Sequence, residues 1–277
     1  MPNPTDFLYK RAPLVEVIYE LHWELKAVKV APDARIDNYF ELFAEQFIDW
    51  AKKEGFERVD RLIPEDVPLE LVPSRPLFRL RKSPDTWPLY QIGPGIFTAN
   101  IIPPYNGWND FKAFIKQGIS GVVQSYPVSE KTLRFSKAHC RYLDAFDLSF
   151  GYQGDVFEYI SNNLNLGLHL PQFVQDTHAV QAKGAQIAFD VRVPIDDPTD
   201  SFGFIRVRSG KNKSDDAVVV ELFCETNGHK YLSNIESILE WNDMAHQVLR
   251  NWFDGLISDD LRSKMLPKLP IKSPEGN

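Results

Sequence analysis

The chain repeats one order of predicted elements, and this repeat constrains the fold more than any other feature of the sequence. In each half a strand is followed by a helix, by several strands and by a long helix. The two long helices open alike, with Trp-Asn-Asp at 108–110 and again at 241–243. We therefore predict an α+β fold made of two copies, residues 1–128 and 129–262. A Pro-rich polar tail, residues 263–277, is expected to fray.

The first strand shows the clearest periodicity. Residues 14–24 alternate between β-branched or aromatic side chains on one face and Glu16, Glu20, His22 and Glu24 on the other. This period of two is typical of an antiparallel strand with one buried and one wet face.

The other elements follow from helical spacing, prolines and turn residues. The predicted helices span residues 37–54, 107–126, 155–164 and 233–257, and the predicted strands span 56–61, 69–72, 77–82, 88–102, 131–148, 174–193, 202–209 and 217–225. Asp37, Asp155 and Ser233 are predicted to lie at helix N-termini as caps or capping boxes. Gly118 and Gly121 inside the second helix indicate close packing against another element.

Two such units have few compact arrangements. We expect one antiparallel sheet, continuous across a pseudo-twofold axis, with the helices packed on one face. This order resembles the duplicated saddle of TATA-binding-protein-like folds. The resemblance concerns topology and implies no function.

Several kinds of chemistry lack their sequence signals. Residues 209–214 contain Gly-Lys but not the upstream glycine of a phosphate-binding loop, and 91–95 lack the third glycine of a dinucleotide fingerprint. No H-x-H, H-x-x-x-H or C-x-x-C pair is present, although such spacing does not test sites assembled from separate strands. Cys140 and His139 are adjacent, so a strand directs them to opposite faces. We therefore predict no catalytic residues, no metal and no cofactor.

Charged side chains on the first strand and on the strand at 131–148 are candidates for binding. If these strands pair near the pseudo-twofold axis, Glu16 is expected to meet Arg141 in an ion pair, with Glu20 nearby. One interpretation is a structural cross-strand pair. The other is a polar binding groove on the open sheet face.

A second candidate is a basic hairpin. Its positive residues are Arg206, Arg208, Lys211 and Lys213, and Asp215 and Asp216 follow at once. A solvated, self-neutralising turn is the favoured interpretation. The net charge of −7 argues against a phosphate backbone as the main ligand.

Composition and cysteine usage indicate a cytoplasmic protein. We find no signal peptide and no apolar run long enough to span a membrane, and the two cysteines suit a reducing compartment. Aromatic residues make up 13% of the chain. Most are expected in the core, although exposed ones would mark a protein-binding surface.

Five blocks of sequence resemble a sporadically distributed family of bacterial proteins of about this length with no assigned activity. They are PLVEV at 13–17, QIGPGIF at 91–97, YNGW at 105–108, RYLD at 141–144 and EWNDMAH at 240–246. Where members of the family tend to have Arg-Tyr-Ile-Asn, this chain has Arg-Tyr-Leu-Asp. The resemblance implies no catalytic residues, and its patchy distribution suggests mobile accessory genes.

Three functions remain open from the sequence. The leading hypothesis is a non-enzymatic binding protein whose partner is another protein or a second copy, in a bacterial defence or toxin–antidote setting. The second is a small-molecule-binding protein or hydrolase with a site between sheet and helices, using Glu16, Arg141 and His139 or His178. A deep pocket with shifted carboxylates would favour it over the first. The third is nucleic-acid binding through residues 206–213.

Overall fold

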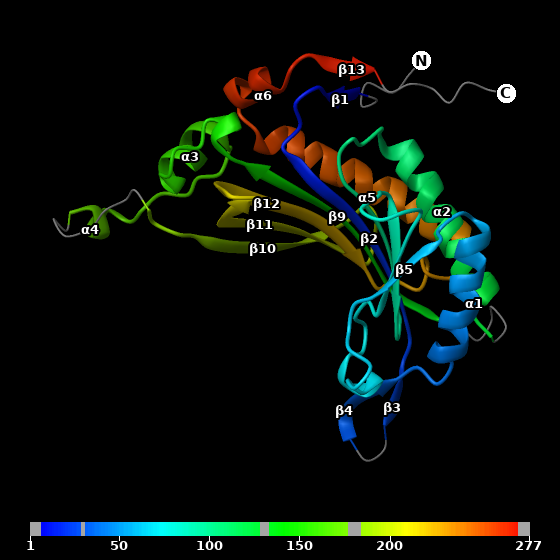
Figure 1. Cartoon of the computed structure of the whole chain (residues 1–277). Helices are drawn as coiled ribbons and strands as arrows, with labels where there is room; N and C mark the ends of the chain where they lie inside the picture. The colour runs from blue at the N-terminus through cyan, green and yellow to red at the C-terminus, as the bar shows by residue number, and fades with distance from the viewer. Residues whose placement is uncertain (1–6, 29–30, 128–132, 177–183, 271–277) are drawn as a thin grey trace.

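A nine-stranded sheet forms the centre of the molecule (Figure 1). The computed structural model describes residues 7–28, 31–127, 133–176 and 184–270. In spatial order the strands are β10 (Ala188–Ile195), β11 (Ser201–Asn212), β12 (Asp215–Thr226), β9 (Phe135–Phe146), β2 (Leu14–Trp23), β8 (Ile96–Ile101), β7 (Leu89–Gly93), β6 (Phe78–Arg81) and β5 (Arg58–Arg61). All neighbouring pairs are antiparallel. The predicted α+β fold with a large antiparallel sheet is confirmed.

Strands β2 and β9 lie side by side at the middle of this sheet. Moving outward from β2, the order is β8, β7, β6 and β5. Moving outward from β9, it is β12, β11 and β10. In each half of the sheet, the strand that comes last in the sequence lies against the strand that comes first: β8 against β2, and β12 against β9. Two copies of one unit would have this arrangement. The division into residues 1–128 and 129–262 stays a prediction.

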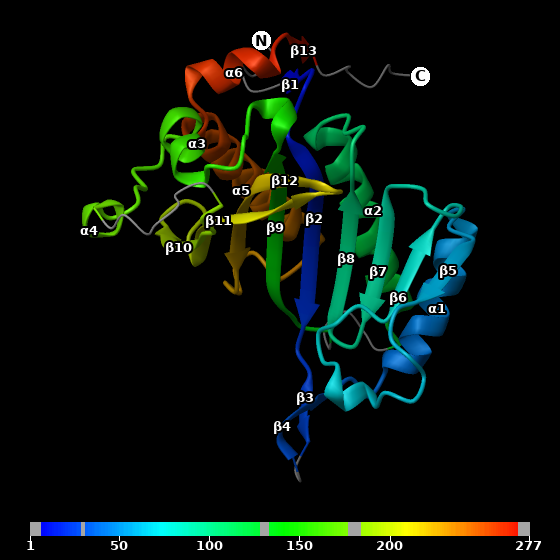
Figure 2. The same cartoon turned by 60° about the vertical axis from the view of Figure 1, so that its left-hand side comes forward.

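Three long helices cover one face of the sheet (Figures 1 and 2). They are α1 (Phe40–Lys53), α2 (Trp108–Ser125) and α5 (Ile235–Leu256). The sheet curves, and its uncovered face, which we call the open face, is concave (Figure 1). No helix in the described ranges is both long and apolar enough to cross a membrane.

Short elements complete the fold at its edges. They are α3 (Val156–Asn163), α4 (Gln172–Gln175), α6 (Asp259–Met265), the 3₁₀ helices η1 (Leu69–Leu71) and η2 (Leu148–Phe150), the paired strands β3 (Lys26–Val28) and β4 (Ala31–Ile36), and the paired strands β1 (Phe7–Tyr9) and β13 (Lys268–Pro270). The β1–β13 pair joins the two ends of the described chain above α5 (Figure 2).

The core lies between the sheet and the long helices. On β2 the side chains of Val17, Tyr19 and Leu21 are fully buried, as the alternation predicts. The glycines of α2 are explained by close packing. A Cβ on Gly118 would lie 2.4 Å from the Phe97 ring. The corresponding atom on Gly121 has a tryptophan ring 2.5 Å away.

Three predicted strands are wrong in part. The strand predicted at 69–72 is absent: Leu69–Leu71 form the 3₁₀ helix η1, and the flanking Pro68 and Pro73 have no N–H to donate to a ladder. Residues 88–102 form the β7–β8 hairpin, in which Gly95 has φ +74° at the turn. Of residues 174–193, only the end belongs to β10; α4 occupies the start, and 177–183 lie outside the described residues.

The predicted helix ends also need correction. The helix predicted from Asp37 begins at Phe40, and Asp37 instead accepts hydrogen bonds from Trp23 Nε1 and Tyr126 OH. Asn234, rather than Ser233, caps α5. The tail predicted to fray at 263–277 starts inside α6 and then forms β13, whose backbone pairs with β1; residues 271–277 lie outside the described residues. Asp155 caps α3 as predicted.

Candidate functional site

A cavity of about 670 Å³ lies between the helix-covered face of the sheet and α5, beneath the β1–β13 pair. We call it the α5 cavity. Strand β9 provides Tyr142 and Asp144, and the segment 103–109 before and at the start of α2 closes one side. Other lining side chains are Tyr9, Leu14, Leu222, Asp243, His246, Gln247, Leu249, Arg250 and Phe253. Its volume is that of a typical small-molecule site.

Strand alternation decides which side chains reach this cavity. Successive residues of a strand point to opposite faces. Tyr142 and Asp144 therefore face α5, whereas His139 and Arg141 face the concave side and form ion pairs there. Strand β9 thus supplies polar groups to both faces, and Cys140 lies buried on the helix side, away from His139.

Asp144 is the most unusual group in the α5 cavity. The residue is 4% exposed, and its carboxyl group lines the cavity together with the Arg250 side chain. Burial raises its pKa to about 7, and the Arg250 guanidinium opposes that rise. Near neutral pH the group is present in both protonation states, so it is able to donate or accept a hydrogen bond. A carboxyl group at the wall of a largely apolar cavity is available to hydrogen-bond a ligand or a bound water.

His246 forms part of the opposite wall. Its ring stacks on Trp108 with centroids 4.5 Å apart, and its Nδ1 lies 2.7 Å from Tyr142 OH. Burial lowers the pKa of His246 to about 4, and the Arg250 charge lowers it further while Asp243 opposes both effects. The imidazole is therefore neutral at physiological pH.

Asp243 joins the two helices that frame the cavity. Its carboxylate accepts a hydrogen bond of 2.7 Å from Trp108 Nε1 and another from Lys112 Nζ. These contacts hold the start of α2 against α5, and with them the ring on which His246 stacks. The Trp108 indole is consequently held in place and forms a flat wall of the cavity.

The sequence blocks that carry the family resemblance meet here. Leu14, Trp108, Asp144 and His246, one residue from each of four blocks, all line the α5 cavity. No protein-family model matches the chain, and no curated protein sequence matches it. The resemblance therefore stays a prediction, and the cavity is described from its own residues.

The charged residues predicted on the first strand pair differently from the expectation. Strands β2 and β9 are neighbours, as predicted, but Arg141 contacts Glu20 (3.5 Å) and Glu221 (3.2 Å) rather than Glu16. In the register of the strands Arg141 lies opposite Ile18, and a bulge separates Leu14 from Glu16 on β2. Glu16 Oε1 instead accepts a 2.8 Å hydrogen bond from Asn100.

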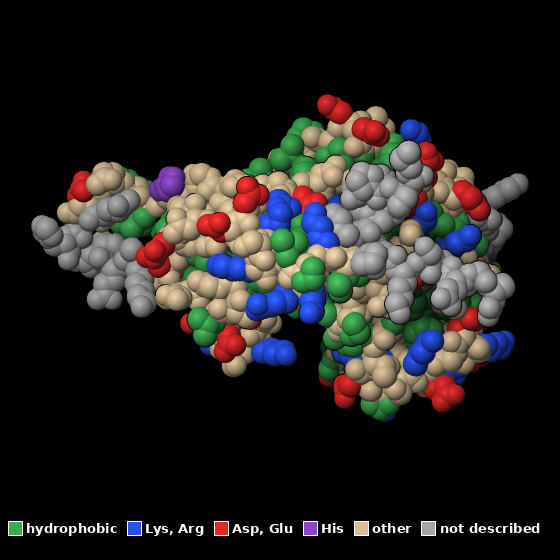
Figure 3. Space-filling view, turned by 90° about the horizontal axis from the view of Figure 1, so that it is seen from above, with side chains coloured by type: hydrophobic (Ala, Val, Ile, Leu, Met, Phe, Trp, Pro, Cys, Tyr) green, Lys and Arg blue, Asp and Glu red, His purple; other side chains and the backbone are tan. Residues whose placement is uncertain are grey.

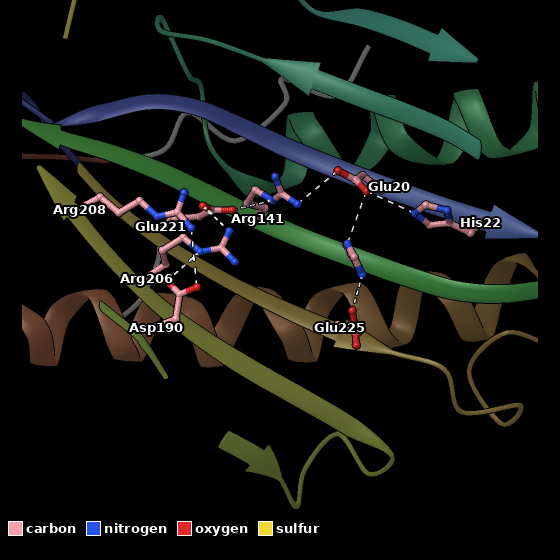
Figure 4. A network of polar contacts seen from close by, with 9 residues as sticks. Glu20, His22, Arg141, Asp190, Arg206, Arg208, Glu221 and Glu225 are labelled. Carbon is pink, nitrogen blue, oxygen red and sulfur yellow. Dashed lines mark hydrogen bonds and ion pairs between the residues drawn. The ribbon is translucent and has the colours of Figure 1, made fainter. Parts of the chain in front are cut away.

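The two arginines of the basic hairpin are paired with acids, but with other acids than those predicted. Arg206 pairs with Asp190 (3.0 Å) and Glu221 (3.1 Å), and Arg208 lies 3.7 Å from Asp190 (Figure 4). No ion pair with Asp215 or Asp216 occurs among the described residues. Lys211 lies near the end of β11 and Lys213 at the turn, outside this network.

Arg206 and Arg208 therefore lie among acidic side chains on the open face. On the other side, toward α6 and β13, acidic and basic side chains are both present (Figure 3). A phosphate backbone requires a continuous basic surface. Nucleic-acid binding through residues 206–213 is therefore not the function that this geometry favours.

The sequence missed most of the α5 cavity. Its candidates Glu16, Glu20 and Arg141 lie on the β2 and β9 strands but not in the cavity lining, and His178 lies outside the described residues. The signal that was present is the Arg-Tyr-Leu-Asp block, which ends with a carboxylate on the buried face of a strand. A charged side chain at a strand position whose neighbours two residues away are apolar is expected to be buried, and a buried charge indicates a site.

Proposed function

We propose that the chain binds a small organic molecule in the α5 cavity. The observation that carries this proposal is the Asp144 carboxyl group, which belongs to a buried residue and lines a cavity of about 670 Å³ together with Arg250. Such a group lowers the stability of the empty protein and gains a hydrogen-bond partner when a ligand enters.

The lining suggests the class of ligand. Tyr9, Trp108 and Phe253 provide aromatic surface for a flat apolar body. The cationic Arg250 side chain lines the same cavity as Asp144, which is half-protonated near pH 7. We infer an aromatic or otherwise flat molecule that carries a negatively charged or hydrogen-bonding group.

This proposal replaces a protein partner as the leading hypothesis. A protein-binding role was favoured by the abundance of aromatic residues, but Trp23, Trp108 and Trp241 are buried. Among the described large apolar side chains that are exposed, Tyr39 and Phe173 are the aromatic ones. Two exposed rings, one beside α1 and one on α4, do not form an apolar patch of the size that protein interfaces use.

The test uses 1-anilinonaphthalene-8-sulfonate, a flat aromatic anion whose fluorescence rises in apolar sites. We expect one bound probe per chain. Asn109 lines the cavity and is exposed, so Asn109→Trp is expected to narrow the entrance and weaken binding at least tenfold. Asp110→Trp is the matched control, because it adds the same ring one residue further along α2, outside the lining.

The same preparation is examined by native mass spectrometry. A small molecule retained by the wild-type chain and absent from Asn109→Trp would identify the natural ligand. Equal probe binding by Asn109→Trp and Asp110→Trp would contradict the proposal. Co-purification of a stoichiometric protein, with no small molecule and no probe binding, would again favour the hypothesis of a protein partner.

A further inference from the structure

Three potential metal ligands meet on the open face of the sheet, outside the α5 cavity. Glu20 and His22 are two residues apart on β2, so both point to this face (Figure 4). His139 lies directly opposite Glu20 on β9. One ligand atom from each of the three side chains lies within 4.8 Å of the other two.

A fourth residue orients one of these ligands. Glu225 on β12 lies opposite His139, and its Oε2 is 2.7 Å from His139 Nε2. When Nε2–H donates to this carboxylate, Nδ1 carries the lone pair and faces Glu20. Metal-binding histidines typically have this arrangement, with one nitrogen toward the ion and the other hydrogen-bonded to a carboxylate.

The nitrogen that faces Glu20 is unsatisfied. His139 is 7% exposed, and its buried Nδ1 makes no hydrogen bond with any described residue. Glu20 Oε2 is 3.5 Å away, beyond a good hydrogen bond. A lone pair and a carboxylate oxygen that face each other at this distance repel, unless a proton or a metal ion lies between them.

The distances suit a tetrahedral ion. Bonds of about 2.0–2.1 Å place ligand atoms of such an ion about 3.3–3.4 Å apart. Glu20 Oε2 lies 3.3 Å from His22 Nε2 and 3.5 Å from His139 Nδ1. The two histidine rings have centroids 5.6 Å apart, so a modest rotation of either ring brings their nitrogens into the same range.

We propose that Glu20, His22 and His139 bind a divalent transition-metal ion, with Zn²⁺ the best match, and that Glu225 orients His139. Two imidazole nitrogens favour zinc and its neighbours over Mg²⁺ or Ca²⁺, which prefer oxygen. Arg141 contacts the other oxygen of Glu20, whereas Oε2 is the oxygen that faces both histidines. Three protein ligands leave one position for water or a small ligand, as in catalytic zinc sites.

The test is a titration of the full-length, tag-free chain with Co²⁺ after dialysis against EDTA. Tetrahedral Co²⁺ absorbs in the visible, and Zn²⁺ added afterwards is expected to displace it. We expect one equivalent per chain. His22→Gln and His139→Gln are expected to weaken binding at least a hundredfold, and Glu225→Gln about 10–100-fold. His229→Gln is the control, because this histidine is exposed in the loop after β12.

Near-ultraviolet circular dichroism reports whether each variant is folded, because its signal requires fixed side-chain packing. Failure of wild-type chain to take up Co²⁺ would overturn the proposal and leave a histidine–carboxylate ion pair. Uptake that survives in folded His22→Gln and His139→Gln would place the ion elsewhere and overturn it as well. Neither result depends on whether the α5 cavity binds the fluorescent probe.

Discussion

Replacing Asp144 with asparagine is expected to stabilise the protein at neutral and alkaline pH, and to have little effect near pH 4. The buried carboxyl group has a folded-state pKa of about 7, against 3.8 for an ordinary aspartate. Between these values the folded chain keeps a proton that the unfolded chain has lost. The stability of the wild type therefore falls as pH rises from 3.8 to about 7. Asparagine has the same shape and stays neutral throughout.

The size of the effect follows from the two pKa values. Each pH unit between 3.8 and about 7 corresponds to about 1.4 kcal/mol, which gives about 4 kcal/mol in total. The free energy of unfolding of Asp144→Asn, minus that of the wild type, is expected to rise by this amount from pH 4 to pH 8. The wild type must be subtracted because the titration of His246 changes the free energy of unfolding with pH in the opposite direction. Its lowered pKa gives stability that is present above pH 6.5 and lost toward pH 4.

Urea unfolding of both proteins at half-unit pH steps measures this difference, from which the contribution of His246 cancels. Asp85→Asn is the control, because the Asp85 side chain is 98% exposed and its replacement is expected to give a nearly flat difference. A flat difference for Asp144→Asn as well would refute the reasoning. It would mean that Asp144 is solvated or paired, and that the α5 cavity is more polar than its lining indicates.

Other substitutions test the packing and the buried polar groups. Gly118→Ala is expected to cost about 1–3 kcal/mol, because the new Cβ would meet an aromatic ring, whereas Gly255→Ala in α5 meets no atom within 4 Å and is expected to stabilise by about 0.5–1 kcal/mol. Thermal unfolding compares the two. Asp37→Ala is expected to cost about 2–4 kcal/mol, because an indole N–H and a phenol O–H lose their acceptor; equal stability in urea would contradict those hydrogen bonds. Cys140 and Cys224 are buried, and burial raises the pKa of both thiols, so neither is expected to react with Ellman's reagent until the chain unfolds.

Much of the fold is predictable from the sequence, because it depends on local patterns. The alternation in residues 14–24 predicts β2 and the face that it buries. Helical spacing predicts α2 and α5 to within two residues. A short apolar run between prolines is compatible with either a strand or a 3₁₀ helix, and at η1 the strand prediction is wrong.

The sequence also places the right residues on the right faces. It predicts that Glu20 and His22 share one face of a strand, and that His139 and Arg141 share a face of another. Which of them touch depends on the register of β2 against β9. In that register Arg141 lies opposite Ile18, one step from both Glu16 and Glu20, and it pairs with Glu20 while Glu16 accepts a hydrogen bond from Asn100.

The sequence by itself therefore determined most of the elements, the α+β class, and the face of the strand or helix to which a side chain points. These features depend on patterns over a few neighbouring residues. Only the tertiary structure decided which residues became neighbours. The α5 cavity joins Leu14, Trp108, Asp144 and His246, and the histidine–carboxylate cluster joins His22 to His139. Leu14 and His246 are 232 positions apart in the chain, and His22 and His139 are 117 apart, so no local pattern encodes these contacts. They arise from strand pairing and helix packing, which minimise the free energy of the whole molecule.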